Sequence, residues 1–354
     1  LLDGDSEFAK NARGLNVALV RLEDLGAVSD FDERLREFMV AVEAAVERFA
    51  SPLLVIACPP SDGSAAKAAH DAAVTQFAAR WADKDRLQFI AADAIQDRYS
   101  VPDALVEDAG GSEQIPYTEE FYAALGSTIA RTAFRTFATP AKVIVIDCDN
   151  TLWSGACAEL GPAGVEVEPG HRTLYEALIE QQRSGILLCL CSKNRPDDVH
   201  ATFDQRDDIA LDRNSHFVAE RINWESKSKN IASIAEELDL GLDSVVFIDD
   251  NPVECAEVSA TLPEVLAIQL PGDSSEFPEF LEHIWPRDHR PHTAEDEKRT
   301  ELYQREAARQ RAREGAPSFE EFLDKLEWKV ELSPADAEDL PRLAQLTQRT
   351  NQFN

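Results

Sequence analysis

Short apolar runs alternate with longer amphipathic stretches in the first part of the chain. Residues 16–22, 53–58 and 87–91 are apolar enough to form buried strands, and 31–49 and 65–81 show the spacing of apolar positions that is typical of amphipathic helices. This alternation predicts an α/β unit at the N-terminal end of the chain.

The strand signals become stronger in the middle of the chain. A predicted helix at 119–137 ends ahead of Pro140, and apolar runs follow at 142–146, 186–191 and 244–248, with helical patterns between them. Strands that are separated by helices favour βαβ units in a parallel sheet, where ligands bind at the carboxyl ends of the strands. We therefore predict a second α/β core with a parallel sheet.

Each of these three strands runs directly into polar residues. Asp147 and Asp149 follow the first strand, Ser192 follows the second, and the pair Asp249 and Asp250 follows the third. The carboxyl ends of parallel strands meet at one edge of a sheet, so these side chains are expected to converge on one site.

These residue types suit phosphoryl transfer. One of Asp147 and Asp149 can attack phosphorus as a nucleophile while the other protonates the leaving oxygen. The adjacent carboxylates after the third strand repel each other unless a cation intervenes, which predicts Mg²⁺. Ser192 can hold a phosphate oxygen, and Lys227, at the start of a predicted helix, can balance the charge.

Each of these residues taken alone has a plainer interpretation. Asp147-Cys148-Asp149 could be a turn with an aspartate helix cap, Ser192 could be another cap, and Lys227 could be a solvated lysine. The ordered combination at strand and helix ends is far more specific than any member, so we favour the catalytic interpretation.

The ordered set resembles the four motifs of the haloacid dehalogenase (HAD) superfamily. The resemblance implies that Asp147 is the nucleophile and a Mg²⁺ ligand, and that Asp149 is the general acid/base and a ligand through its backbone carbonyl. It also implies that Asp249 binds the metal with the assistance of Asp250. The residues expected to bind phosphate are Thr151, Ser192, Lys193, Asn194 and Lys227.

The site is expected to be open. Only about 35 residues separate Thr151 from the second predicted strand, which is too few for a separate cap domain plus the expected helix. An uncapped site can admit a phosphate that is carried on a large molecule.

Longer motifs give a closer resemblance, to the FkbH-like family. They are 147–155 (DCDNTLWSG), 191–194 (CSKN), 223–230 (NWESKSKN), 247–252 (FIDDNP), 346–354 (LTQRTNQFN) and 115–117 (IPY). Where that family often has a proline before the lysine of the third motif, this chain has Ser226.

The closer resemblance implies a glyceryl transferase of polyketide biosynthesis. Such an enzyme takes 1,3-bisphosphoglycerate, removes phosphate and leaves a glyceryl thioester on a phosphopantetheinylated acyl carrier protein. An enzyme cysteine is expected to carry the acyl group, and we favour Cys148, with Cys191 and Cys157 as the next candidates. These cysteines could instead be small core residues.

Two other functions remain open. A plain HAD phosphatase, acting on a phosphoprotein or a small phosphate ester, needs the same aspartates but no cysteine. A non-catalytic docking module would keep the fold without turnover.

The predicted organisation has four parts. We expect an α/β accessory domain at 1–140, a HAD-like catalytic core at 141–275, a helical segment at 276–326, and the start of a truncated, acetyltransferase-like α/β segment at 327–354. The first part resembles a degenerate SGNH hydrolase domain. It shows no convincing Ser/Asp/His catalytic triad, so we expect this domain to bind a ligand or to cover the site rather than to catalyse a reaction.

The charge composition limits the classes of binding partner that we expect. The chain has 354 residues with 66 acidic and 35 basic side chains, a formal net charge of −31 that disfavours nucleic acid and anionic membranes. A carrier protein is commonly acidic too, so we expect it to dock on a local basic patch such as a helix near 299–313.

The cysteine pattern and the absence of targeting signals indicate a cellular compartment. The six cysteines form no CxxC pattern, and there is neither a long apolar span nor a signal sequence, so a reducing cytoplasm is expected. The chain opens at Leu1, and we expect it to be a fragment of a longer protein.

Overall fold

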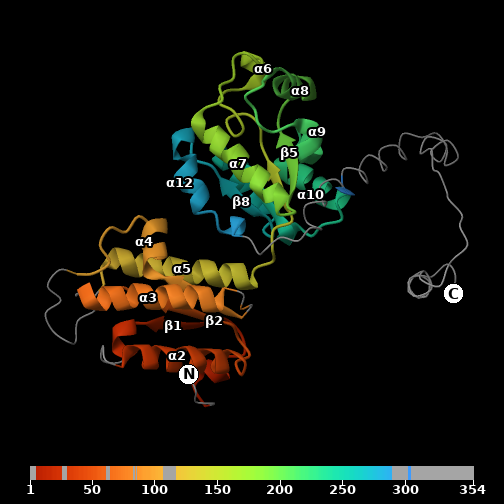
Figure 1. Ribbon diagram of the computed structural model, residues 1–354. Helices are drawn as coiled ribbons and strands as arrows, with labels where there is room; N and C mark the ends of the chain where they lie inside the picture. The colour runs from red at the N-terminus through yellow and green to blue at the C-terminus, as the bar shows by residue number, and fades with distance from the viewer. Residues whose placement is uncertain are drawn as a thin grey trace, which may run out of the picture. The chain divides into compact units, whose positions relative to one another are not determined.

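The computed structural model describes most of the first 288 residues (Figure 1). The described residues are 5–25, 30–60, 64–82, 84, 86–106, 117–288 and 302–303. The chain divides into two compact units, Leu1–Thr300 and Glu301–Asn354, and the features below belong to the first unit.

Several predicted features lie outside the described residues. They are the strand and most of the helices beyond 288, apart from helical Leu302 and Tyr303, and the motif segments 346–354 and 115–116. Among the described residues, no helix is both long and apolar enough to cross a membrane.

The first sheet contains three parallel strands in the order β1-β2-β3. Alternate residues of the central strand β2 face two separate cores, because side chains alternate along a strand. Val55 packs with residues of α2 and α3, whereas Ile56 packs with Phe121 of α5 and Ile95 of α4. The elements are α1 (Glu7–Lys10), β1 (Asn16–Val20), η1 (Leu22–Leu25), α2 (Phe31–Val46), β2 (Leu53–Ala57), α3 (Ser64–Trp81), β3 (Leu87–Ala91), α4 (Ala92–Arg98) and α5 (Glu119–Phe137).

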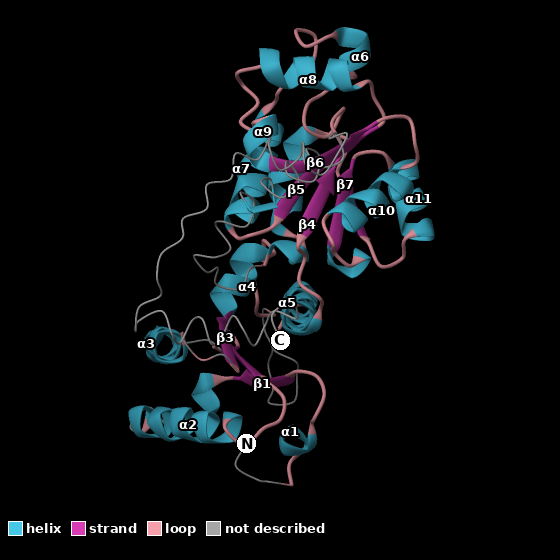
Figure 2. Ribbon diagram, turned by 90° about the vertical axis from the view of Figure 1, so that its right-hand side faces the viewer, coloured by secondary structure: helices cyan, strands magenta, loops and turns pink. Residues whose placement is uncertain are grey.

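The second sheet contains five parallel strands in the order β6-β5-β4-β7-β8 (Figure 2). The chain runs from β4 outward to β5 and β6 and then returns to the other side of β4, so the strand order reverses there. Ligands in open α/β sheets bind at such a switch point. The strands are β4 (Val143–Ile146), β5 (Leu187–Ser192), β6 (Phe217–Ile222), β7 (Val245–Asp249) and β8 (Leu266–Gln269).

Helices connect all five strands. Leu174 and Leu178 of α7 pack into the core beside Ile144 and Leu188 of the sheet. The connecting elements are α6 (Cys157–Leu160), α7 (Pro169–Arg183), α8 (Pro196–Gln205), α9 (Arg213–His216), α10 (Lys227–Glu237), η2 (Leu242–Ser244) and α11 (Pro252–Thr261). After the sheet follow η3 (Ser274–Glu276), α12 (Phe277–Glu282) and η4 (Trp285–Arg287).

The predicted parallel strands are present, and two more strands were not predicted. The apolar runs at 142–146, 186–191 and 244–248 correspond to β4, β5 and β7. The edge strands β6 and β8 are less buried, and β6 has a mixed sequence that includes Glu220 and Arg221. The apolar run at 265–268 did give a strand signal for β8.

The start of α7 makes a tight contact with a later segment. Glu168 caps the helix in a capping box with His171, and Pro169 occupies the first turn. A Cβ atom at Gly170 would lie 1.7 Å from the backbone oxygen of Ser274, so only glycine fits at this crossing.

A charged contact joins the end of the described chain to α5. Arg131 is buried, and its guanidinium donates to the Asp288 carboxylate, with Nη2 to Oδ1 at 2.6 Å, and to the Glu282 carbonyl at 2.9 Å. A bidentate arginine–carboxylate pair of this kind has a well-defined geometry.

Candidate active site

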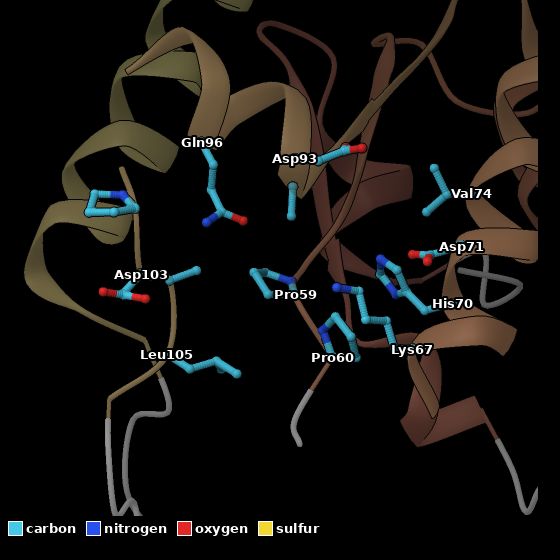
Figure 3. A pocket seen from close by; sticks show the side chains of 13 residues that line it. Pro59, Pro60, Lys67, His70, Asp71, Val74, Asp93, Gln96, Asp103 and Leu105 are labelled. Atoms are coloured by element: carbon cyan, nitrogen blue, oxygen red, sulfur yellow. The ribbon is translucent and has the colours of Figure 1, made fainter. Parts of the chain in front are cut away.

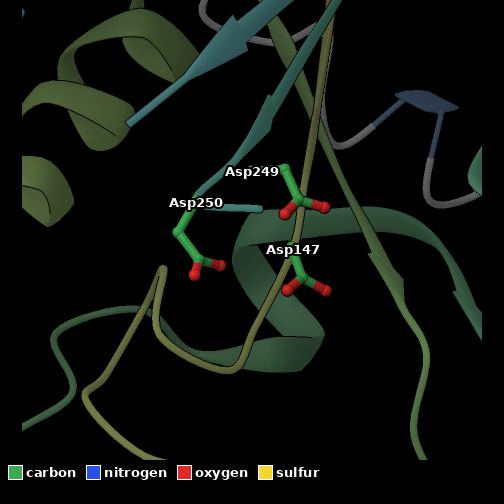
Figure 4. Close-up of side chains that lie close together, drawn as sticks. All are labelled: Asp147, Asp249 and Asp250. Atoms are coloured by element: carbon green, nitrogen blue, oxygen red, sulfur yellow. The ribbon is translucent and has the colours of Figure 1, made fainter. Parts of the chain in front are cut away.

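Three carboxylates meet at the carboxyl edge of the second sheet. Asp147 follows β4 directly, and its N–H donates to the Ile248 carbonyl of β7 at 3.0 Å. This bond extends the strand pairing and brings Asp147 beside Asp249 and Asp250 (Figure 4). One oxygen from each of the three carboxylates lies within 4.8 Å of the others.

A buried lysine completes this cluster. Lys227 is the first residue of α10, where Ser226 caps the helix by accepting from the Lys229 N–H at 3.4 Å. Its Nζ lies 2.6 Å from Asp147 Oδ1 and 3.0 Å from Asp249 Oδ2. Ser226 therefore caps the helix that begins at Lys227, at the position where the FkbH-like family often has a proline.

The charged groups of this cluster shift one another's pKa values. Burial alone would lower the pKa of Lys227, but the carboxylates of Asp147 and Asp249 hold that pKa above its ordinary value, so the ammonium stays charged. Burial and the nearby Asp147 raise the pKa of Asp249 to about 6. The same two causes raise the pKa of Asp250.

The cluster suits a divalent cation. Three carboxylates face one ammonium, which leaves negative charge uncompensated in a buried place. Asp249 Oδ2 is buried and accepts no hydrogen bond among the described residues, although Lys227 Nζ is 3.0 Å away. Carboxylate oxygens are the ligands that Mg²⁺ prefers, so a magnesium ion fits this donor set.

Asp149 lies in a separate set of hydrogen bonds. Its Oδ2 accepts from Asn194 Nδ2 at 2.7 Å, and its Oδ1 accepts from Trp153 Nε1 at 2.9 Å and the Cys157 N–H at 3.1 Å. The turn that carries it includes Asn150 at a φ of 57°, a conformation that asparagine tolerates. The carboxylate of Asp149 is not among the three clustered ones, and its predicted backbone contact with the metal stays a prediction.

The residues predicted to bind phosphate have varied partners. Thr151 Oγ1 donates to Asp250 Oδ1 and accepts from the Asp250 N–H, both at 3.2 Å, so this hydroxyl positions Asp250. Lys193 Nζ donates to Glu254 Oε1 at 2.8 Å. Ser192 is buried at the end of β5. Their phosphate contacts, and that of Asn194, stay predictions.

The three candidate cysteines are buried. Cys148 is 0% exposed and lies in the apolar core of the second sheet. Its burial, with Asp147 next to it, raises the pKa of the thiol well above the ordinary value, which opposes formation of the nucleophilic thiolate. The role of Cys148 as the acyl carrier stays a prediction, which its burial does not favour.

The other two candidates are also buried. Burial raises the pKa of both Cys191 and Cys157 to about 12, with Lys227 opposing the shift in the first and Asp149 adding to it in the second. Cys157 lies nearest to polar groups, since Asn194 Nδ2 donates to its sulfur at 3.4 Å.

Sequence reasoning missed two contributors to the site. Trp153, inside the first motif, donates to Asp149, and only its place in that motif could have drawn attention to it. Glu254 pairs with Lys193 across 61 positions of sequence, and no local pattern indicates that contact.

Comparisons with known proteins bear on the fold. No protein-family model and no curated protein matches the chain. Among solved structures, the N-terminal part of the protein BF1531 from Bacteroides fragilis, containing a phosphatase domain complexed with Mg, is similar with 18% identity and a TM-score of 0.65, over 80% of this chain and 81% of that chain. The fold is of the HAD type.

Smaller HAD proteins also match. A HAD family enzyme from Bacteroides thetaiotaomicron, in complex with magnesium and inorganic phosphate, is 14% identical with a TM-score of 0.28, over 37% of this chain and 95% of that chain. A putative HAD-like phosphatase from Mesorhizobium loti is 12% identical with a TM-score of 0.30, over 44% of this chain and 91% of that chain.

The predicted fold class is confirmed for the HAD-type core. Its Rossmann-like sheet is wholly parallel. Between Thr151 and β5 the fully described chain forms turns, an isolated bridge between Ser154 and Glu166, α6 and α7, so the cap is minimal. The FkbH-like and SGNH-like resemblances and the domain boundaries stay predictions.

Proposed function

We propose that this chain is a Mg²⁺-dependent phosphatase of the HAD type in which Asp147 takes up a phosphoryl group. The observation that carries the proposal is the convergence of the carboxylates of Asp147, Asp249 and Asp250, with Nζ of buried Lys227 within 3.0 Å of the first two. A carboxylate cluster at the switch point of a parallel sheet suits phosphoryl transfer, because the group to be transferred is anionic and must be neutralised before attack.

The residues of the chain have distinct parts in the reaction. A bound Mg²⁺ ion supplies positive charge that lets a carboxylate approach the phosphoryl group. An oxygen of Asp147 attacks phosphorus while the bond from phosphorus to the leaving oxygen breaks, and Asp149 gives that oxygen a proton. Lys227 holds Asp147 Oδ1 at 2.6 Å and orients it for this attack.

Water then completes the cycle. A water oxygen attacks the phosphorus of the aspartyl-phosphate, and its proton passes to the carboxylate of Asp149. The bond from phosphorus to the Asp147 oxygen breaks, which releases phosphate and restores both aspartates.

The test of this proposal is phosphate release from acetyl phosphate and p-nitrophenyl phosphate. The unmodified chain should release phosphate with Mg²⁺ and lose this activity with EDTA, and Asp147→Asn should be inactive. Asp207→Asn, in an exposed turn of the same core, is the matched control and should keep full activity. Retained activity in Asp147→Asn would refute the role of Asp147, and absence of Mg²⁺-dependent phosphate release from the unmodified chain would favour the non-catalytic docking module.

A narrower proposal names the substrate. The chain would act on 1,3-bisphosphoglycerate, release phosphate and transfer the glyceryl group to the thiol of a phosphopantetheinylated acyl carrier protein. In the acyl transfer the thiol sulfur attacks the acyl carbon, the bond from that carbon to the phosphate oxygen breaks, and the thiol proton leaves with phosphate. The phosphate ester at C3 is hydrolysed through Asp147, so two phosphates are released for each glyceryl group transferred. The FkbH-like motifs and the minimal cap support this.

Exposed apolar side chains beside the site also favour a large partner. Trp224 and Val253 are each 71% exposed. Trp224 lies three positions before Lys227, and Val253 lies three positions after Asp250. Exposed aromatic residues are common in protein–protein interfaces, so these loops suit the docking of a carrier protein.

Mass spectrometry of the carrier distinguishes the two functions. With 1,3-bisphosphoglycerate and the carrier, glyceryl transfer adds one glyceryl group to the pantetheine arm, whereas a plain phosphatase releases phosphate and leaves the carrier unchanged. Acyl adducts on the enzyme, followed in Cys148→Ser and Cys157→Ser variants, decide which thiol takes part. We expect Cys148→Ser to keep any adduct, because Cys148 is buried in the core.

A further inference from the structure

A second cavity lies far along the chain from the aspartate cluster, at the carboxyl edge of the first sheet. It has a volume of about 430 Å³ and is lined by residues that follow β2 and β3 and by α3 and α4 (Figure 3). Pro59 and Pro60 follow β2, and Asp93 follows β3. The carboxyl ends of parallel strands are where α/β sheets bind ligands, and this volume is typical of small-molecule sites.

A buried histidine faces this cavity without a partner. His70 of α3 is 7% exposed, and its Nδ1 is buried and makes no hydrogen bond to any described residue. Burial lowers the pKa of His70, although Asp71, Asp93 and Glu23 oppose the shift, so the ring is neutral at pH 7. A buried polar atom that lacks a hydrogen bond is costly, and a ligand would remove that cost.

A second polar group faces the same space. Gln96 Nε2 donates to the Val101 carbonyl at 3.1 Å. With the amide nitrogen held in this way, the carboxamide oxygen of Gln96 faces the cavity (Figure 3). Gln96 and His70 line the cavity from different helices, α4 and α3.

The charges around the cavity disfavour an anion. The carboxylates of Asp71, Asp93 and Asp103 would repel it, and Lys67 carries the single ammonium among the lining residues, which would repel a cation close to it. Pro59, Val74 and Leu105 add apolar walls that suit CH groups.

A metal ion does not fit this cavity. In the part of the chain that the structure describes, the cluster of Asp147, Asp249 and Asp250 gathers ligand atoms closely enough for a metal ion, and no such cluster forms around His70. The unpartnered nitrogen therefore points to an organic ligand.

We propose that this cavity binds a small, uncharged organic molecule that carries hydroxyl groups, one of which hydrogen-bonds His70 Nδ1 and another the Gln96 carboxamide oxygen. A hydroxyl group both donates and accepts, so it satisfies either tautomer of the neutral ring. The proposal is independent of the reaction at Asp147, because none of the lining residues belongs to that site.

The test follows the His70 ring by ¹⁵N NMR of the full chain during titration with matched probes. The probes are the neutral molecules glycerol, xylitol, D-glucose and D-panthenol, with glycerate, gluconate and pantothenate as acids and glucosamine as an amine. At least one neutral probe should shift the His70 ring signals saturably, and its charged counterpart should bind at least tenfold more weakly. No shift by any neutral probe at 50 mM, or tighter binding of the acids or the amine, overturns the proposal.

Two variants separate binding from folding. His70→Phe fills the ring volume without the nitrogen, so it should abolish probe binding, read as loss of the probe-induced rise in melting temperature, and leave the melting temperature of the probe-free chain unchanged or higher. His70→Asn places a polar group near the position of Nδ1 and should retain part of the binding. His216→Phe, on exposed α9, is the matched control and should bind like the unmodified chain. If His70→Phe lowers the probe-free melting temperature while binding persists, His70 has a purely structural role and the proposal fails.

Discussion

Lys227 Nζ lies 2.6 Å from Asp147 Oδ1, on a side chain that is 2% exposed. Removing one partner of such a buried pair leaves the other charge uncompensated, which typically costs about 3–5 kcal/mol. Lys227→Met should therefore lower the free energy of unfolding, measured in urea without metal. It should also lower the rate of phosphate release by about 100-fold or more. Lys229→Met is the control two positions away, because Lys229 is exposed and its pair with Glu225 is long, at 3.6 Å. Equal losses in both variants would contradict a specific role for Lys227.

Magnesium should stabilise the folded chain through Asp249. A ligand at 100 times its dissociation constant adds about 2.7 kcal/mol to the free energy of unfolding. We expect a gain of this order on addition of Mg²⁺, reversed by EDTA, in calorimetry or urea titrations. The gain should shrink in Asp249→Asn and persist in Asp243→Asn, whose carboxylate lies in η2 outside the cluster. An undiminished gain in Asp249→Asn would place the ion elsewhere.

The effect of Asp149→Asn should depend on the leaving group. An alkyl phosphate needs a proton on its leaving oxygen, so we expect a loss of about 100-fold or more in kcat, within the range of general acid catalysis. Acetyl phosphate leaves as a stable carboxylate, so phosphoryl transfer from it to Asp147 should be affected much less. Single-turnover rates isolate this step from the later attack of water, which uses Asp149 with both substrates. The measurement is the ratio of the two rates in the variant and in the unmodified chain. Equal losses on both substrates would argue that Asp149 only supports the fold through its bonds to Asn194 and Trp153.

Trp224→Ala should weaken the use of a carrier protein and spare small substrates. The side chain is 71% exposed, so truncation costs little folding energy, while loss of an interface aromatic typically costs about 1–2 kcal/mol of binding. We expect KM for the pantetheinylated carrier to rise about tenfold and the rate on acetyl phosphate to stay constant. Phe137→Ala, at the exposed end of α5, serves as the control. A parallel loss on acetyl phosphate would mean that Trp224 acts on the site itself.

The buried His70 should make stability fall in mild acid. Its pKa is lowered in the folded chain, so as pH falls below about 6.5 the unfolded chain takes up the proton first. The stability that the neutral His70 ring contributes to the folded chain is fully present above pH 6.5 and is lost progressively below it. Between pH 7.5 and 5.5 the unmodified chain should lose more free energy of unfolding than His70→Phe, measured in urea titrations. Identical pH dependence in the two chains would mean that His70 titrates normally when folded.

The aspartate site was largely predictable because it depends on strand order rather than on side-chain detail. The apolar runs that became β4 and β7 placed Asp147 and Asp249 at strand ends, and parallel pairing then brought them together. The alternation of side chains along β4 also explains why Cys148 is buried in the core. Ile144, Ile146 and Cys148 share one core, whereas Asp147 lies between two of them and faces the other way.

Other features required contacts between distant residues. The pair of Lys193 and Glu254 joins two loops, and neither residue stands out in sequence. The cavity beside His70 depends on how α3, α4 and the residues after β2 pack, and a single histidine in a helical pattern gives no sign of an unsatisfied nitrogen.

The bond between Arg131 and Asp288 limits how the polypeptide can be shortened for laboratory work. A fragment that starts at residue 141 lacks Arg131, and one that stops before Asp288 leaves a buried guanidinium without its carboxylate. Either cut would expose surface that is now covered, and such fragments would be prone to aggregate during purification. Expression plasmids for this protein should therefore keep residues 117–288 in one piece.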